Sequence, residues 1–597
     1  MKNAQKEEFQ IHKLNDAIMD AYKKAAPLFE KYKKKYNLSD SMGQFANIDF
    51  DPMNAQESYM NFLEKIAQNP NKFIEIQAGF ANEWMNLWQQ SMSNFVVGQG
   101  NQETISPQKG DRRFKAHEWQ ESALFDFIKQ SYLLTCNHIE KTLEDSTDLD
   151  DKKKEKLKFQ AKLFTNAMSP SNFLLTNPEV LNETMKTGGE NLVKGFQNLL
   201  EDLQRGDGDL NISTTNYEAF ELGKNIATTK GSVIYQNELM QLIQYEAKTD
   251  KVNKTPLLII PPWINKYYIL DLHKGNSLIE WAVEQGHSVF VISWVNPDSK
   301  LSKKNFENYM LEGVIESLDQ IEESTGESEI NVLGYCLGGT LLATTMAYLT
   351  KKKQGKRIKS ATFLTTLLDF EHAGDMKLFL DDEQLKKLDE MMDKHGVLDG
   401  KEMQKTFALM RANDLIWSFV VNNYLMGREP FPFDLLYWND DCTNMPAAMH
   451  RFYLRNMYRD NKLIKAGGIS MDGVDIDLST IKTPCHFISA KEDHIAPWVA
   501  TYEGTKLMSG DVTFTLAASG HIAGVVNPPH KNKYCYWSND KTPKSHDEWL
   551  DKATRHEGSW WGVWDEWVAN FSDSKVNARK IQNEIEPAPG SYVRVRY

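Results

Sequence analysis

This sequence of 597 residues lacks the patterns that mark membrane-spanning, secreted and disulfide-bonded proteins. No run of apolar residues approaches the roughly 18 that a membrane-spanning helix requires, so we expect no transmembrane segment. The first residues, MKNAQKEE, contain no apolar stretch, which argues against a secretory signal. The five cysteines are widely spaced and odd in number, so they predict neither a disulfide framework nor a CxxC metal site and favour a reducing cytoplasm.

Basic residues are fewer than acidic residues, and this balance argues against nucleic acid as a partner. The sequence has 69 Lys and Arg against 82 Asp and Glu, a formal net charge of -13. We see no cluster of His and Cys with the spacing of metal ligands, so we expect no metal. Hydrophobic residues make up 41% and charged residues 25%, a globular balance in a chain long enough for two domains.

The pattern of apolar residues changes near residue 210 and predicts two domains. In residues 1–210 apolar side chains recur at helical spacing, which predicts an all-helical N-terminal domain with helices at 11–36, 80–95, 119–143 and 153–168 and a polar linker at 98–104. In residues 211–597 short β-branched runs alternate with helical stretches, which predicts an α/β fold with a mostly parallel sheet. The clearest strands are 257–260, 288–292, 329–333, 361–364, 486–489 and 512–516. Between about 370 and 450 the alternation stops, and we expect a helical cap over a site.

The segment Gly334-Tyr335-Cys336-Leu337-Gly338 lies between a predicted strand and a predicted helix. This is the G-x-S-x-G nucleophile elbow of α/β hydrolases with sulfur in place of oxygen. Its glycines permit a sharp turn that exposes the central side chain, and the following helix N-terminus favours a thiolate there. We therefore predict that Cys336 is a nucleophile; the alternative is a buried structural cysteine.

An elbow of this type requires an acid and then a histidine, each placed after a later strand. Asp493 follows the strand at 486–489, and His521 follows the strand at 512–516. We predict a triad of Cys336, Asp493 and His521. Glu492 and His494 are nearby competitors; His494 adjoins Asp493 and therefore lies on the wrong loop for the base.

The oxyanion hole of this fold combines the amide after the nucleophile with one from the loop after an early strand. The first amide is that of Leu337. The second loop begins Pro261-Pro262, and because proline has no N–H, the donor is Trp263 or Ile264, of which we favour Ile264.

A cysteine nucleophile favours acyl transfer over hydrolysis. A serine that attacks a thioester forms an oxygen ester, which water then usually cleaves. A cysteine exchanges one thioester for another of similar energy, so the acyl group stays activated for a second nucleophile. Acyl-CoA is the expected kind of substrate.

These residues resemble the polyhydroxyalkanoate synthases, in particular the large single-subunit class I enzymes. The matching segments are GYCLGGT (334–340), PPWINKYYILDL (261–272), EQGH (284–287), FDLLYWN (433–439), EDHI (492–495), GHIAGVVNPP (520–529), GSWW (558–561) and EPAPGSYV (586–593). The resemblance runs from about residue 111 to the end and is weak in the first hundred residues. It implies polymerisation of (R)-3-hydroxyacyl-CoA, expected to be 3-hydroxybutyryl-CoA, with release of CoA through a thioester on Cys336. It also implies that His521 is the general base and that Asp493 assists it and helps to activate the 3-hydroxyl of the incoming unit.

The resemblance implies partners as well. The expected partners are the acyl-CoA substrate, the growing polyester chain, the surface of a polymer granule, granule-associated proteins and a second copy of the chain in a homodimer. The helical N-terminal domain resembles the part linked to activation and granule attachment, and the family needs no cofactor. Cys442, Cys485 and Cys535 have no assigned chemistry. Two alternatives stay open: a thioesterase or polyester hydrolase of the same fold, and a non-catalytic granule-associated protein.

Overall fold

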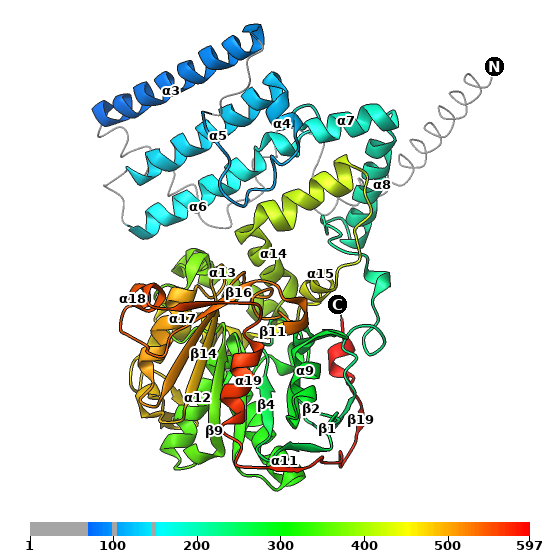
Figure 1. Ribbon diagram of the computed structural model, residues 1–597, viewed down its shortest axis with the longest axis vertical. Helices are drawn as coiled ribbons and strands as arrows, with labels where there is room; N and C mark the ends of the chain where they lie inside the picture. The colour runs from blue at the N-terminus through cyan, green and yellow to red at the C-terminus, as the bar shows by residue number, and fades with distance from the viewer. Residues whose placement is uncertain (1–69, 98–103, 146–150, 597) are drawn as a thin grey trace, which may run out of the picture. The chain divides into compact units, whose positions relative to one another are not determined.

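The computed structural model describes residues 70–97, 104–145 and 151–596, and the chain divides into two compact units. The first unit ends at Asn216 and also includes residues 406–432, whereas the second contains residues 217–405 and 433–597 (Figure 1). The helix expected at 11–36 and nearly all of the linker expected at 98–104 lie outside the described residues. Part of the segment that the sequence suggests as a cap therefore belongs to the first unit.

The first unit is helical in its described part, as the spacing of its apolar residues predicts. The expected helix at 80–95 lies within α3, and the one at 153–168 corresponds to α6. The one expected at 119–143 is interrupted at Ser122, whose extended backbone (φ -89°, ψ 117°) separates α4 from α5. Its helices are α3 (Pro70–Val97), α4 (Glu118–Glu121), α5 (Ala123–Glu144), α6 (Asp151–Ala167), α7 (Pro178–Thr187) and α8 (Glu190–Arg205).

Residues 406–432 join the first unit because they pack against α8. Asn191 Nδ2 donates to the carbonyl of Leu425 at 2.7 Å, and Asn198 Nδ2 donates to that of Asn423 at 2.9 Å. The two backbones approach so closely that a Cβ on Gly195 would lie 1.8 Å from the carbonyl oxygen of Tyr424. These residues form the π-helical turns η9 (Asn413–Trp417) and η10 (Val420–Leu425).

An 11-stranded sheet forms the centre of the second unit, in the order β17-β16-β15-β14-β9-β8-β4-β7-β2-β1-β19. The six strands from β15 to β7 are parallel, and they are the six strands that the sequence predicts. The five outer strands pair antiparallel. The bounds are β1 (Gly231–Gln236), β2 (Met240–Tyr245), β4 (Leu257–Ile260), β7 (Val289–Trp294), β8 (Ile330–Tyr335), β9 (Ile358–Leu364), β14 (Cys485–Ala490), β15 (Val512–Ala517), β16 (Cys535–Ser538), β17 (Thr554–Glu557) and β19 (Glu586–Pro587).

Helices cover the central strands of the sheet (Figure 1). Every residue of β4, β7, β8 and β14 is buried. Burial on both faces explains why these strands are continuous apolar runs rather than alternating patterns. The α/β-hydrolase fold class predicted from the sequence is confirmed. The helices of this unit include α9 (Leu278–Glu284), α11 (Glu316–Thr325), α12 (Leu337–Lys351), α13 (Asp382–His395), α15 (Asp434–Asn439), α16 (Ala447–Tyr453), α17 (Trp498–Gly504), α18 (His546–Asp551) and α19 (Trp561–Ala569); α14 (Gly400–Met410) begins in this unit and ends in the first.

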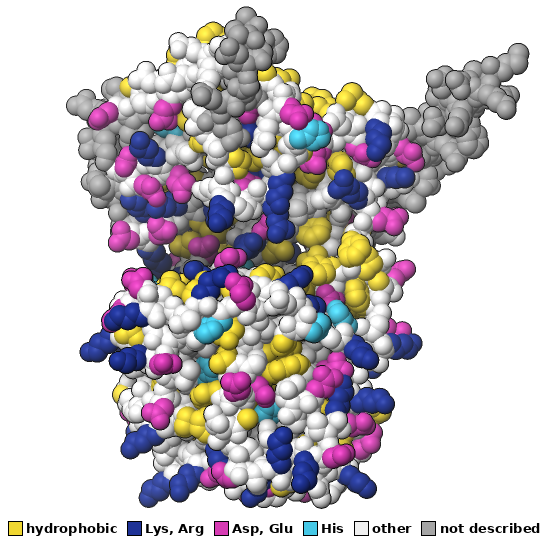
Figure 2. All heavy atoms as spheres, in the orientation of Figure 1, with side chains coloured by type: hydrophobic (Ala, Val, Ile, Leu, Met, Phe, Trp, Pro, Cys, Tyr) yellow, Lys and Arg dark blue, Asp and Glu magenta, His cyan; other side chains and the backbone are white. Residues whose placement is uncertain are grey.

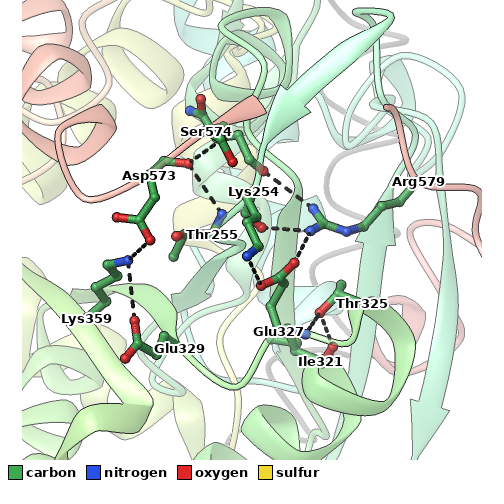
Figure 3. A network of polar contacts seen from close by, with 12 residues as sticks. Lys254, Thr255, Ile321, Thr325, Glu327, Glu329, Lys359, Asp573, Ser574 and Arg579 are labelled. Carbon is green, nitrogen blue, oxygen red and sulfur yellow. Dashed lines mark hydrogen bonds and ion pairs between the residues drawn. The ribbon is translucent and has the colours of Figure 1, made fainter. Parts of the chain in front are cut away.

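The chain after α19 returns along the edge of the sheet at which the parallel strands begin. There β18 (Lys575–Asn577) pairs with β3 (Lys251–Asn253), and Arg579 fastens the segment (Figure 3). The Arg579 guanidinium donates to the carbonyl of Lys254 at 2.7 Å and to Ser288 Oγ at 2.9 Å, and it pairs with Glu327 at 3.3 Å. Lys359 similarly bridges Asp573 and Glu329.

We expect Arg579→Ala to destabilise the second unit by about 2 kcal/mol, because it removes the hydrogen bonds to the carbonyl of Lys254 and to Ser288 and one of the two cations that pair with Glu327. Thermal unfolding measures the change as a lower midpoint. Arg555→Ala is the matched control, since Arg555 pairs with Glu557 at the surface and such surface pairs contribute little. Equal midpoints for the two variants would contradict the fastening role of Arg579.

The surface carries charges of both signs. Figure 2 shows Lys and Arg side chains interspersed with Asp and Glu on the face that it presents. Among the described helices, none combines the length and the hydrophobicity needed to cross a membrane. The apolar residues are instead concentrated in the core around the sheet.

Candidate active site

Cys336 lies at a sharp turn between β8 and α12, where the sequence predicts a nucleophile elbow. Its backbone is in a region that non-glycine residues rarely adopt (φ 53°, ψ -120°). The flanking glycines are required by close contacts: a Cβ on Gly338 would lie 2.1 Å from the carbonyl oxygen of Ile260, and one on Gly339 would lie 2.0 Å from Thr366 Oγ1. The strained turn presents the Cys336 side chain beyond the end of the sheet.

His521 and Asp493 lie beside this turn, each directly after a strand. Because β15, β14, β9 and β8 are parallel neighbours, the loops that follow them meet at one edge of the sheet. His521 Nδ1 and Asp493 Oδ2 are 2.6 Å apart, and the ring of His521 stacks on that of Tyr335. The structure therefore brings together the three residues predicted as a triad, and it pairs His521 with Asp493 rather than with Glu492, which is exposed.

The Asp493 carboxylate is fully buried and its two oxygens have separate tasks. Oδ1 accepts the backbone N–H groups of Ile495 and Ala496 at 2.8 and 2.9 Å, which fixes the carboxylate in place. Oδ2 is then free to accept Nδ1–H of His521. This bond selects the tautomer in which Nε2 is the nitrogen that can take a proton.

Charge around His521 favours its protonated form. Burial lowers its pKa, but the negative charges of Asp493 and Cys336 outweigh burial and raise the pKa of His521 to about 10. The coupling to Cys336 places the thiol within electrostatic reach of the imidazole. A thiolate next to an imidazolium is the arrangement that activates cysteine nucleophiles.

Three other cysteines lie in environments that suppress a thiolate. Burial and the charges of Asp440 and Asp441 raise the pKa of Cys442 to about 12. Burial raises the pKa of Cys485 well above its usual value, and burial also raises that of Cys136. Cys336, by contrast, interacts with the imidazole of His521.

The two predicted oxyanion donors belong to segments that meet at the end of β4. Leu337 is the first residue of α12, so its N–H has no acceptor within the helix. The start of α12 packs on the end of β4, since the place of a Cβ on Gly338 is taken by the backbone of Ile260 and Pro261. The loop that carries Ile264 begins at this contact.

Two tyrosines that sequence reasoning missed lie within electrostatic reach of Cys336. Tyr453 and Tyr458 lie in α16 and the π-helical turn η11 (Leu454–Arg459) and are buried. Burial raises the pKa of both phenols, and the charge of Cys336 raises them further. In the sequence these tyrosines are part of an aromatic run just beyond the expected cap. No spacing rule connects that run to the nucleophile elbow, so the sequence does not predict their place near Cys336.

The described residues contain no group of three or more His, Cys, Asp or Glu placed to hold a metal ion. The groups that the structure brings together here are a thiol, an imidazole, a carboxylate and backbone amides. These groups can perform nucleophilic acyl transfer.

Comparison with known proteins gives the family. A family described as "Poly-beta-hydroxybutyrate polymerase (PhaC) N-terminus" matches residues 110–282, and one described as "alpha/beta hydrolase fold" matches residues 256–528. The chain is 44% identical over 575 residues to the poly(3-hydroxyalkanoate) polymerase subunit PhaC of Rhizobium meliloti (strain 1021), covering 94% of each chain. This chain belongs to the poly(3-hydroxyalkanoate) polymerase family.

Two further relatives agree with this membership. The poly(3-hydroxyalkanoate) polymerase of Methylorubrum extorquens is 45% identical, with 89% of this chain and 88% of that one covered. The polymerase subunit PhaC of Cupriavidus necator is 40% identical, with 88% and 89% covered. The resemblance seen in the motifs is confirmed, and so is the expectation of an acyltransferase of this polymerase family. The roles of Cys336, Asp493, His521, Leu337 and Ile264 stay predictions that the geometry supports.

Proposed function

We propose that this polymerase-family member joins (R)-3-hydroxyacyl units from CoA thioesters into a polyester and releases CoA, with 3-hydroxybutyryl-CoA as its substrate. The observation that carries the proposal is a cysteine, not a serine, at the elbow beside the hydrogen-bonded pair of His521 and Asp493. The family description, which names polyhydroxybutyrate, supports the short acyl chain.

In the first step the Cys336 sulfur attacks the carbonyl carbon of the CoA thioester. The carbonyl oxygen becomes an oxyanion, which the N–H groups of Leu337 and Ile264 stabilise. The intermediate then collapses: the bond to the CoA sulfur breaks, and the departing sulfur takes the proton held on His521 Nε2. The acyl group is left on Cys336 as a thioester, and His521 is left neutral.

In the second step neutral His521 takes the proton of a 3-hydroxyl group. The resulting oxygen nucleophile attacks the carbonyl carbon of the Cys336 thioester, an ester bond forms, and Cys336 leaves as a thiolate. The imidazolium that results is stabilised by Asp493, which accepts its Nδ1–H. The chain has grown by one unit, and the thiolate and imidazolium are restored.

We further propose that the protein is cytoplasmic, works as a homodimer at the surface of polymer granules and meets granule-associated proteins there. Support comes from the described face of α3, on which several large apolar side chains are exposed: Trp84, Met85, Trp88 and Met92. Apolar side chains of this kind bind to apolar surfaces such as a polyester.

The test uses purified protein and (R)-3-hydroxybutyryl-CoA, with free CoA followed by a thiol reagent and polymer by turbidity. CoA release with rising turbidity is the expected result. CoA release with soluble 3-hydroxybutyrate and no turbidity would make the protein a thioesterase and overturn the proposal. Longer 3-hydroxyacyl-CoA substrates, run in parallel, test the proposed chain length.

A further inference from the structure

One hydroxyl group holds the peptide unit that carries the predicted oxyanion donor. Thr443 Oγ1 donates a hydrogen bond to the carbonyl oxygen of Trp263, and the Thr443 side chain is buried. The carbonyl of Trp263 and the N–H of Ile264 belong to the same planar peptide group. Thr443 therefore contacts the opposite end of the peptide group whose N–H is the predicted oxyanion donor.

In a trans peptide the C=O and N–H bonds point in opposite directions, and the plane between them is rigid. A hydrogen bond that fixes the carbonyl oxygen thus fixes the direction of the N–H, and it also polarises that N–H. We propose that Thr443 is a positioning residue that directs the Ile264 N–H into the oxyanion hole. This inference rests on the proposed function, because it assigns a task in its first chemical step.

The neighbouring peptide groups are fixed from the same side. The backbone N–H of Thr443 donates to the carbonyl of Ile264 at 3.0 Å, and Asn265 and Cys442 form a β-bridge. The indole N–H of Trp438 donates to the carbonyl of Lys266 at 2.6 Å. The segment 438–443 thus holds three carbonyls of this loop, those of residues 263, 264 and 266.

A buried ion pair anchors that segment to the loop. Lys266 Nζ lies 2.6 Å from Asp441 Oδ1, and both side chains are at most 2% exposed. Lys266 Nζ also donates to the carbonyls of Val593 and Val595 at 2.7 and 2.8 Å, so its three protons are all used. The other Asp441 oxygen accepts Tyr268 OH at 2.8 Å and faces Arg596 at 3.3 Å.

The ring of Trp263, the residue that supplies the carbonyl of this peptide group, is also held in place. The indole is 1% exposed, packs against Tyr309 with 4.4 Å between ring centroids, and donates Nε1–H to Met449 Sδ. With the Trp263 side chain fixed, the peptide group between residues 263 and 264 can still rotate about its Cα–C bond. The hydrogen bond from the Thr443 hydroxyl to the carbonyl oxygen restricts that rotation. Removing the hydroxyl frees the group that forms the oxyanion bond.

The experiment separates oxyanion stabilisation from the general condition of the site. Acylation of Cys336 by (R)-3-hydroxybutyryl-CoA passes through an oxyanion, whereas alkylation of the same sulfur by iodoacetamide does not. We would measure both rates in Thr443→Val, which replaces the hydroxyl with a methyl group of similar size, and in Thr443→Ser, which keeps it. Mass spectrometry of the Cys336 peptide distinguishes this thiol from the other four.

For Thr443→Val we expect acylation to slow by about 10- to 100-fold. This loss should not exceed the loss of about 100- to 1,000-fold that follows deletion of an oxyanion donor itself. Alkylation of Cys336 should stay at the wild-type rate, and Thr443→Ser should restore acylation. Thr505→Val is the matched control, because Thr505 is also buried and donates to a backbone carbonyl, that of Tyr502 at 2.7 Å. It should change neither rate.

Three results would overturn the inference: unchanged acylation in Thr443→Val, a parallel fall of acylation and alkylation, or an equal loss in Thr505→Val. If Thr443→Val does not fold, Thr443→Ala removes the same hydroxyl without adding bulk and is judged by the same outcomes. Failure of the proposed function is distinct, because the wild-type protein would then form no acyl-enzyme at all.

Discussion

Cys336→Ala should abolish CoA release, acyl-enzyme formation and polymer. Without the sulfur there is no nucleophile for the thioester, and His521 and Asp493 alone cannot hold an acyl group. Loss of the nucleophile in enzymes with a comparable triad lowers turnover by about 10⁴-fold or more. Free CoA followed with a thiol reagent measures the turnover, and intact-protein mass spectrometry detects the acyl-enzyme.

The matched controls are Cys442→Ala and Cys485→Ala. Both thiols are buried, and the pKa of each is raised, so neither supplies a thiolate at neutral pH. We expect both variants to release CoA at a rate close to that of the wild type, provided that they fold. Retained activity in Cys336→Ala, or a lost acyl-enzyme in Cys442→Ala alone, would refute the assignment of the nucleophile.

Asp493→Asn should slow chain elongation more than the first acylation. The asparagine can still accept the N–H groups of Ile495 and Ala496, but its NH₂ cannot accept the Nδ1–H of His521. The imidazole then loses its correct tautomer and its charge partner, a change that costs about 10²- to 10⁴-fold in catalysis by triads. Elongation suffers more because it removes a proton from a hydroxyl group, which is far less acidic than the Cys336 thiol.

The two steps can be resolved by time. Rapid-quench measurement of the first equivalent of CoA reports acylation, and the later steady rate of CoA release reports elongation. Asp472→Asn is the control, because Asp472 pairs with Lys352 at the surface. Equal loss in both phases would remove the second role of Asp493 and leave it only the task of orienting His521.

The sequence predicts the centre of the catalytic unit because its signals there are local. Cys336, Asp493 and His521 each follow a strand that reads as a short apolar run, and the order of those strands in a parallel sheet brings the three loops together. The Gly334 and Gly338 pattern is equally easy to see in the sequence, because the two glycines lie four residues apart. A Cβ on Gly334 would meet the turn itself, and one on Gly338 would meet the end of β4, the neighbouring strand.

The outer parts of the fold depend on pairings between distant residues, which a single sequence does not display. The edge strand β17 is largely exposed, so it lacks an apolar pattern, and β19 has only two residues. Residues 406–432 join the first unit through bonds such as the one from Asn198 to Asn423, which are 225 positions apart. Thr443 was missed for the same reason: its partner, Trp263, lies 180 positions earlier.

Residues 593–596 complete a buried contact with the loop that carries a predicted oxyanion donor. The carbonyls of Val593 and Val595 and the guanidinium of Arg596 belong to the cluster around Lys266 and Asp441, and β19 closes one edge of the sheet. Removal of residues 593–596, for example by a protease, would therefore withdraw support from the loop at 263–266 while the thiol of Cys336 stays in place.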